Sequence, residues 1–161
     1  MIIDSNGYPT GHFKKTLSFD DVLLTPNYSD IESRSEINTT NILGSHELVL
    51  PIISSPMDTV TGADMATSMA LMGGMGIVHR YSTVEEQVEI VEDVLDYTAE
   101  SMDTCPVAAA IGVSGDFLDR AKALYEVDVA TICVDVAHGH HILMERALKT
   151  LKDTFGERMH I

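Results

Sequence analysis

The chain has 161 residues, 45% of them hydrophobic and 22% charged, a balance typical of a soluble globular domain. Its 25 acidic and 10 basic residues give a formal net charge of −15, which argues against a nucleic-acid-binding surface, because such surfaces need clustered Lys and Arg. We interpret the acidity as a solvated surface, and the alternative is an acidic face that meets a basic partner chain. The most apolar stretch, residues 65–78, is too short to span a membrane and the N-terminus lacks a signal-peptide pattern, so we expect no membrane association and a cytoplasmic location.

The first 47 residues are rich in turn-forming residues, apart from an acidic and apolar segment at 17–26, Leu-Ser-Phe-Asp-Asp-Val-Leu-Leu-Thr-Pro. They lack the regular pattern that begins near residue 48. We therefore expect two parts: residues 1–47 as an N-terminal extension that packs on a barrel domain, and residues 48–161 as that domain, incomplete.

From residue 48 onward, short apolar runs alternate with helical patterns. The runs lie at 48–54, 76–79, 107–111 and 129–134. This alternation predicts an α/β fold of βα units with a parallel sheet. The spacing fits a (β/α)8 barrel, which uses roughly 250 residues for eight units, and it also fits a doubly wound sheet. Residues 159–161 look like a fifth strand that stops after it starts, and a sheet ending there would have two open edges.

The helices are predicted from periodicity and caps. Residues 61–72 are apolar nearly all round, which predicts a well-buried helix. Ser82 and Glu85 form a predicted capping box, and the helix after it has one apolar face: Val84, Val88, Val91 and Leu95. Ser114 is the predicted N-cap of a third helix, with a buried stripe of Phe117, Leu118, Ala121, Leu124 and Tyr125. A fourth helix should end at Gly156 and bury Leu143, Ala147, Leu151 and Phe155.

Two cysteines, Cys105 and Cys133, are too few for a disulfide framework. Cys133 lies inside an apolar run and is interpreted as a small core residue. Cys105 precedes a proline and has no obvious activating partner. We therefore assign neither thiol to catalysis.

Ligands of barrel enzymes bind at the C-terminal ends of the strands, which directs attention to three loops, at 54–60, 78–81 and 135–141. Each also has a structural interpretation. The first could be a turn in which Asp58 or Thr59 caps the next helix, and His79 and Arg80 in the second could be solvated turn residues. The third contains three histidines, but it has no Cys or HExxH-like context for zinc. Asp135, directly after a buried strand, is either a helix cap or a ligand contact.

Several of these segments resemble one family. Residues 17–26 resemble the N-terminal signature of the IMP dehydrogenase and GMP reductase family. Residues 51–61, Pro-Ile-Ile-Ser-Ser-Pro-Met-Asp-Thr-Val-Thr, are similar to the first barrel strand and loop of IMP dehydrogenase in particular, since GMP reductases usually carry Ala-Asn-Met in place of Ser-Pro-Met. Residues 73–80, Gly-Gly-Met-Gly-Ile-Val-His-Arg, and 134–140, Val-Asp-Val-Ala-His-Gly-His, are similar to the second and fourth strands.

The resemblance implies the N-terminal half of a (β/α)8 TIM barrel, about four βα units plus a strand stub. It also implies an oxidoreductase that converts IMP to XMP with NAD in guanine nucleotide biosynthesis. In that family a cysteine thiolate attacks C2 of the purine, hydride leaves to the nicotinamide, and water hydrolyses the covalent intermediate. A potassium ion orders the cysteine loop. By position, Ser55 and Met57 match residues that contact IMP, and Asp135 matches the carboxylate that binds the nicotinamide ribose of NAD.

Two departures from the family pattern matter. Only residues 96–106 occupy the place where most IMP dehydrogenases insert regulatory CBS modules, a trait shared with GMP reductases, which are the alternative. The family's next motif, Gly-Asn-Val, would begin just after Ile161, followed by the cysteine loop and the potassium ligands. No residue here matches the family nucleophile, so we expect the chain alone to be inactive and to need a complementary C-terminal barrel half. The complete enzyme is expected to be a homo-oligomer, a tetramer.

A second hypothesis is a non-catalytic binding or assembly module that keeps the half-barrel as a scaffold. The presence of Ser55, Met57 and Asp135 favours the enzyme, because a scaffold needs no polar set at its strand ends.

Overall fold

The computed structural model describes residues 5–6, 16–101 and 105–161. Its contacts divide the chain into two units, Met1–Ile37 and Asn38–Ile161. The predicted boundary between extension and barrel domain at residue 47 stays a prediction, and by their contacts residues 38–47 group with the second unit. Packing of the first unit on the second stays a prediction. Within its described residues, the first unit has two short 3-10 helices, η1 (Phe19–Asp21) and η2 (Arg34–Glu36), and its large apolar side chains are exposed, Phe19 at 97%.

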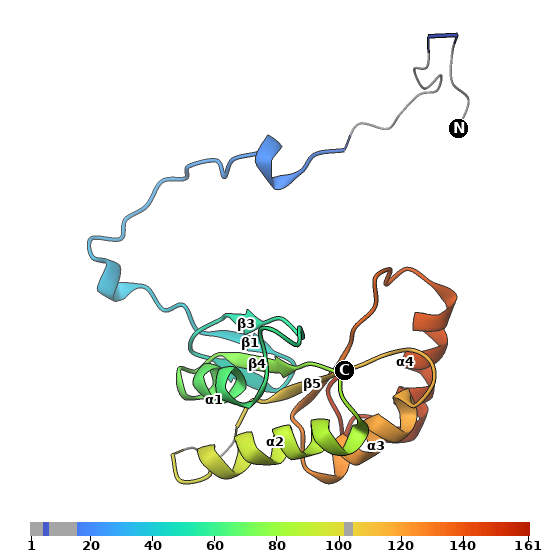
Figure 1. Ribbon diagram of the computed structural model, residues 1–161. Helices are drawn as coiled ribbons and strands as arrows, with labels where there is room; N and C mark the ends of the chain where they lie inside the picture. The colour runs from blue at the N-terminus through green and yellow to red at the C-terminus, as the bar shows by residue number, and fades with distance from the viewer. Residues whose placement is uncertain (1–4, 7–15, 102–104) are drawn as a thin grey trace. The chain divides into compact units, whose positions relative to one another are not determined.

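The second unit is built on a four-stranded parallel sheet with the order β3-β4-β5-β6 (Figure 1). The strands are β3 (Ile53–Ser54), β4 (Met75–Val78), β5 (Ala108–Ile111) and β6 (Thr131–Val134). A helix follows each strand in turn: α1 (Ala63–Leu71), α2 (Val84–Thr98), α3 (Phe117–Glu126) and α4 (Ile142–Phe155). The predicted α/β architecture of four βα units is confirmed, and it is consistent with half of a TIM barrel.

The predicted fifth strand also begins where expected. His160 forms a parallel bridge with Thr131, and the Ile132 amide donates to the His160 carbonyl oxygen over 2.9 Å. His160 therefore starts to pair with the outer edge of β6.

The first predicted strand was wrong in its extent. Residues 48–54 read as one apolar run, but Leu48 ends an antiparallel hairpin of β1 (Asn41–Leu43) and β2 (His46–Leu48), and β3 contains only two residues. The hairpin was missed because its strands are short. Its turn depends on Gly44, whose φ of 60° favours glycine.

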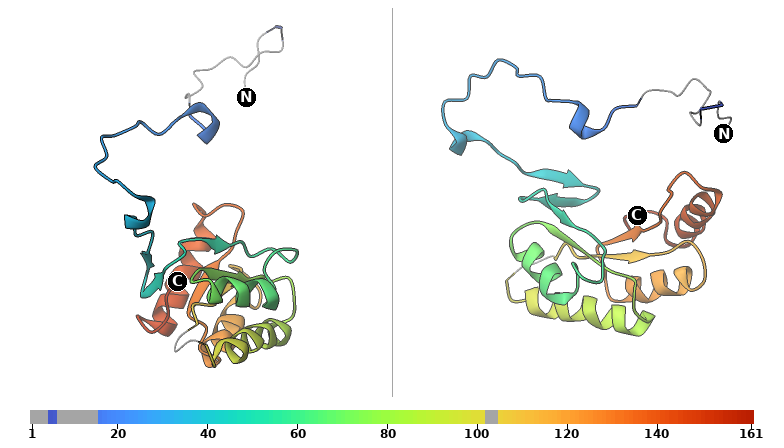
Figure 2. Two further views of the ribbon diagram at one scale, coloured as in Figure 1. Left: turned by 90° about the vertical axis from the view of Figure 1, so that its left-hand side faces the viewer. Right: turned by 45° about the horizontal axis from the view of Figure 1, so that its top comes forward.

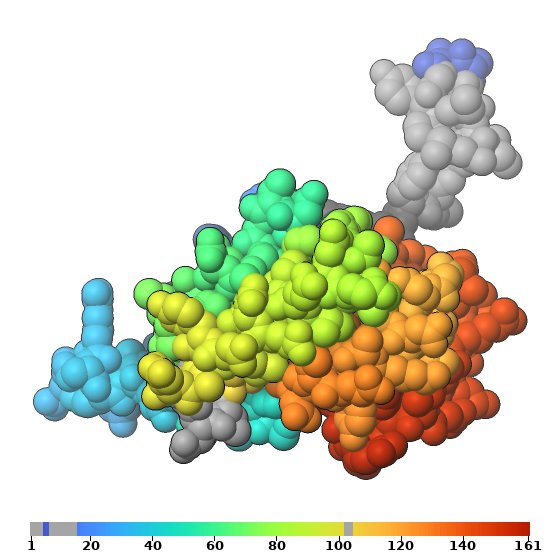
Figure 3. All heavy atoms as spheres, turned by 60° about the horizontal axis from the view of Figure 1, so that its bottom comes forward, coloured from blue at the N-terminus to red at the C-terminus, as the bar shows by residue number. Residues whose placement is uncertain are grey.

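The sheet separates two apolar layers. Helices cover one face (Figure 2), where Val78, Ala109, Ile111 and Ile132 pack into the main core. In the space-filling view from below, α2 and α3 lie side by side (Figure 3). On the opposite face, Leu43 and Leu48 of the hairpin pack against Met75, Ile77 and Ala108. That inner face keeps an apolar hollow of about 380 Å³ beside β6. Among the described residues, no helix is long and apolar enough to cross a membrane.

Two helix starts differ from the prediction. The capping box of α2 is formed by Thr83 and Glu86, whose backbone and side chains bond reciprocally at 2.9 and 3.1 Å, one residue later than predicted. The N-cap of α3 is Asp116, two residues after Ser114, and its carboxylate bonds Arg120 instead of the helix backbone. The end of α4 at Gly156, with φ 62°, is confirmed.

Helix α1 is less buried than its composition predicted. Only Ala66 and Ala70 are buried, while Met65 and Leu71 are exposed. The small residues face the sheet because backbone and helix approach closely there: a Cβ on Gly76 would lie 2.5 Å from Ala66 Cα. Close packing at this contact requires glycine and alanine, so the larger apolar side chains of α1 point away from it.

We expect Gly76→Ala to destabilise the fold by about 1–3 kcal/mol, the usual cost of overpacking a close contact. Thermal or urea unfolding measures this. The control is Gly139→Ala, because a Cβ there meets nothing within 4 Å, and its stability should match the unsubstituted chain. Equal stability of the two variants would contradict the close contact.

Candidate functional site

The loops after the four parallel strands meet at one edge of the sheet, because parallel strands share the direction of their C-terminal ends. The strand order places Ser55 and Met57, after β3, at one end of this edge. Asp135, after β6, lies at the other end. Arg80 follows β4 and Gly112 follows β5, so they lie between. The structure thus sets the three predicted site residues along one edge, with Ser55 and Met57 separated from Asp135 by two strands.

The first loop is held by a buried threonine. Thr61 Oγ1 donates to the Ser55 carbonyl oxygen at 2.6 Å and lies 2.9 Å from Ser54 Oγ. The side chains of Ser55 and Met57 are exposed, so they are accessible to a ligand. The suggestion that Asp58 or Thr59 caps the next helix was wrong, because the N-cap of α1 is Gly62.

Asp135 lies beside Arg80. Arg80 Nε is 3.4 Å from Asp135 Oδ2, and the two side chains are 33% and 31% exposed. The Asp135 amide donates to the Ile111 carbonyl oxygen at 2.9 Å, which fixes the backbone where β6 ends. The helix-cap interpretation of Asp135 was wrong, because α4 begins after His141, whose Nδ1 accepts from the Leu143 amide.

Arg80 is more constrained than a solvated turn residue. Its guanidinium lies over Gly112, where a Cβ would be 3.6 Å from Nη1, and 5.3 Å from the Tyr81 ring centroid. Its Nε is buried and makes no hydrogen bond among the described residues. The polar contact of this atom is the longer ion pair with Asp135. Half-exposed ion pairs contribute about 0–1 kcal/mol to stability, so stability alone does not account for this one.

A buried polar network lies directly beneath these loops and was missed by the sequence analysis. Gln87 of α2 is fully buried and Arg120 of α3 nearly so, and their side chains hydrogen-bond at 2.9 Å. Both lie on the apolar stripes of their helices, where a polar side chain has to find partners inside the fold. That position was the available signal.

The two cysteines are both half-buried. Burial raises the pKa of the Cys133 thiol, and the negative charge of Asp135 raises it further. Burial also raises the pKa of Cys105, against the opposing effect of hydrogen bonds with Thr98 and Val107. Cys133 lines the inner hollow, so its interpretation as a core residue was only partly right. Raised pKa values favour the thiol form, which is the weaker nucleophile.

These shifts predict slow alkylation of both thiols at pH 7 compared with free cysteine, because less thiolate is present. Asp135→Asn removes a charge that raises the pKa of Cys133. Cys133 should then react faster at a given pH, while Cys105 should not change. Pulsed alkylation between pH 7 and 9, read by peptide mass, measures both rates, and an unchanged Cys133 rate would show that Asp135 exerts no field there.

The third loop does not bring its histidines to a common centre. His138 and His140 stand edge to face with ring centroids 6.5 Å apart, and His141 is engaged as the N-cap of α4. Within the described part of the chain, no group of three His, Cys, Asp or Glu side chains could hold a metal ion.

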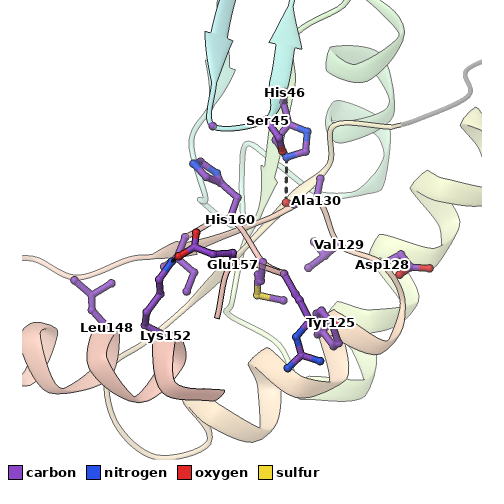
Figure 4. A pocket seen from close by; sticks show the side chains of 14 residues that line it. Ser45, His46, Tyr125, Asp128, Val129, Ala130, Leu148, Lys152, Glu157 and His160 are labelled. Carbon is purple, nitrogen blue, oxygen red and sulfur yellow. Dashed lines mark hydrogen bonds and ion pairs between the residues drawn. The ribbon is translucent and has the colours of Figure 1, made fainter. Parts of the chain in front are cut away.

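A pocket of about 810 Å³ lies at the opposite, N-terminal end of the strands (Figure 4). His46 of the hairpin bonds the Ala130 carbonyl oxygen at 3.1 Å across it, and His160 lines the same space. In barrel enzymes the active site lies at the C-terminal end of the strands, and residues at the N-terminal end serve stability. The size of this pocket therefore does not make it the candidate site.

The IMP dehydrogenase / GMP reductase domain is the family model that matches residues 16–161. The chain belongs to this family. The family resemblance of the sequence motifs is thereby confirmed. The connection at which the sequence departs from the family pattern by leaving no room for CBS modules is short: α2 ends at Thr98 and β5 begins at Ala108.

Several curated relatives are inosine-5'-monophosphate dehydrogenases. The protein from Cryptosporidium parvum is 36% identical over 180 residues, which covers 89% of this chain and 44% of the relative. The protein from Rhodopirellula baltica is 37% identical over 142 residues, 85% of this chain and 25% of the relative. A third, from Nitrosopumilus maritimus, is 50% identical over 80 residues, 49% of this chain and 17% of the relative. The chain therefore spans less than half the length of these relatives.

Proposed function

We propose that this chain forms the N-terminal half of the catalytic barrel of an IMP dehydrogenase, which oxidises IMP to XMP with NAD in guanine nucleotide biosynthesis. The observation that supports this best is the set of side chains that follow the C-terminal ends of the parallel strands. Ser55 and Met57 are exposed at one end, and the Arg80–Asp135 pair occupies the other. A scaffold module would need no such set.

Each predicted residue has a role that its surroundings permit. The Ser55 hydroxyl and the Met57 side chain would contact the IMP nucleotide. One carboxylate oxygen of Asp135 faces Arg80, which leaves the other to accept a hydrogen bond from a ribose hydroxyl of NAD. NAD, when bound, would take up the hydride that leaves C2 of the purine.

The overall reaction consumes IMP, NAD⁺ and water and gives XMP, NADH and a proton. An enzyme thiolate adds to C2, hydride leaves C2, and water then releases XMP and restores the thiol. Cys105 and Cys133 do not suit this role, because their pKa values are raised. We propose that the nucleophile comes from the C-terminal half of the barrel, together with the loop that a potassium ion would order.

The sheet offers two edges for that half. Ile53 of β3 and the preceding Ile52 are exposed, and Ile142, Leu143 and Leu148 are exposed on α4. Exposed apolar surface next to an unpaired strand edge is typical of an interface. A complementary half would extend the pairing that His160 begins along β6 and would cover both flanks. The completed enzyme would form a tetramer, as its family resemblance implies.

The chain alone should show no IMP-dependent reduction of NAD. Mixed or co-expressed with the C-terminal barrel half of a related IMP dehydrogenase, it should form a stable complex by size exclusion and gain turnover, followed as NADH absorbance. A folded monomer that ignores the added half would favour the assembly-module hypothesis. Because the short connection between α2 and β5 is shared with GMP reductases, the same complex is assayed for reductive deamination of GMP, and turnover in that assay alone would select the alternative.

In the active complex, Asp135→Ala should raise the KM for NAD much more than that for IMP. A lost hydrogen bond to a charged acceptor costs about 1.5–3 kcal/mol, which is roughly ten- to a hundredfold in affinity. Asp153→Ala, on the exposed side of α4, is the control and should leave both constants unchanged. Equal effects of Asp135→Ala on both substrates would remove Asp135 from the cofactor site.

A further inference from the structure

We infer that Gln87 and Arg120 are positioning residues: they fix the turn that carries Arg80, and through it the orientation of Asp135, without touching a ligand. This inference rests on the proposed role of Asp135 in binding NAD. It goes beyond that role because neither residue belongs to the strand-end loops.

Gln87 connects two strand ends. Its Nε2 lies 2.9 Å from the carbonyl oxygens of His79 and Ala110 and 3.4 Å from that of Val78. All three carbonyls lie toward the C-terminal ends of β4 and β5, which is the end that carries the candidate site. A primary amide has two hydrogens, so both serve the strand ends, and Gln87 Oε1 remains to accept from Arg120.

Arg120 holds Gln87 and the start of α2 together. Its Nη1 lies 2.9 Å from Gln87 Oε1 and 3.3 Å from the Thr83 carbonyl oxygen, and its Nη2 donates to the Ser82 carbonyl oxygen at 2.9 Å. Asp116 balances the charge, 2.8 Å from Nη2. A lysine could not make this planar set of bonds, because its ammonium lacks the rigid fork of the guanidinium.

The network therefore brackets Arg80 in the sequence. Gln87 holds the carbonyl of His79, one residue before Arg80, and Arg120 holds the carbonyl of Ser82, two residues after it. Between these fixed points the Arg80 side chain reaches across Gly112 to Asp135. A shift of either point would move the guanidinium relative to the carboxylate.

The other buried positions of α2 indicate that the polar network of Gln87 and Arg120 is confined to one part of the helix. The next buried positions, Val91 and Val94, are apolar, and the last, Thr98, donates to the Val94 carbonyl oxygen of its own helix, so none of them bonds a strand end beside the site. Hydrogen-bonded polar side chains in a core fix one geometry at some cost in stability. Here they occur where α2 passes the candidate site.

The variants Arg120→Lys and Gln87→Met test the inference, with Arg146→Lys on the exposed side of α4 as the matched control. The first readout is hydrogen exchange of the His79 amide, which donates to the Thr61 carbonyl oxygen at 3.3 Å, measured by NMR on the whole chain. We expect exchange to rise about tenfold in both variants, because the turn opens locally, while the amides of α4 keep their rates.

The second readout is kinetic, in the complex with the C-terminal half. Both variants should raise the KM for NAD about tenfold, as small misplacements do, with the KM for IMP changed less than twofold. In an Arg80→Gln background, Arg120→Lys should add little further change, because Arg120 acts through Arg80. Full additivity of the two substitutions would overturn the inference.

The outcomes separate this inference from the proposed function. A wild-type complex without turnover would remove the proposed function, while unchanged His79 exchange in the variants would remove the positioning role whether or not turnover exists. Lower thermal stability with unchanged His79 exchange and unchanged KM ratio would show that the network is structural only. If Arg120→Lys fails to fold, Gln87→Met, which keeps the side-chain volume, decides the matter alone.

Discussion

The carbonyl groups at the C-terminal ends of β4 and β5 place the strongest constraint on this structure. Because α2 and α3 cover one face of the sheet beside that end, any carbonyl buried there without a donor costs about 1–3 kcal/mol. Gln87 supplies donors to both strand ends, and Arg120 donates to Gln87 Oε1 and to the Ser82 carbonyl oxygen in the turn before α2. These bonds fix the backbone on both sides of Arg80. The position of Arg80 beside Asp135 therefore follows from the hydrogen bonds that the buried polar side chains make.

Much of the fold could be predicted from local sequence. Apolar runs alternating with helical patterns identified four βα units, and His160 pairs with Thr131 where a fifth strand was expected. The errors arose where a local pattern has two solutions. The run 48–54 looks like one strand, yet a turn at Gly44 folds Leu48 back into a hairpin. Adjacent hydroxyl and carboxylate residues also gave two equivalent registers for the α2 capping box, and the structure uses Thr83 and Glu86.

The candidate site was predictable as an edge of the sheet but not as a set of contacts. Asp135 was identifiable because it follows a buried strand, and Ser55 and Met57 were identified by family resemblance. The partnership of Arg80 and Asp135 depends on the order of the strands, since their side chains meet across the end of β5. Gln87 lies on α2 and Arg120 on α3, with β5 between them in the sequence, so the two side chains meet only in the folded core. A polar residue on an apolar stripe signals such a contact without naming its partner.

The two ends of the sheet differ in what lies against them. At the N-terminal end the hairpin places Leu43 and Leu48 against Met75 and Ala108, and His46 anchors it to the Ala130 carbonyl oxygen beside the pocket there, so apolar packing and a hydrogen bond hold the hairpin at this end. The hairpin leaves the C-terminal end uncovered, and there the exposed polar groups gather on a backbone fixed from below. The groups that we propose for ligand recognition therefore lie at the end where the backbone is already held in place, and the cost of ordering it is met during folding.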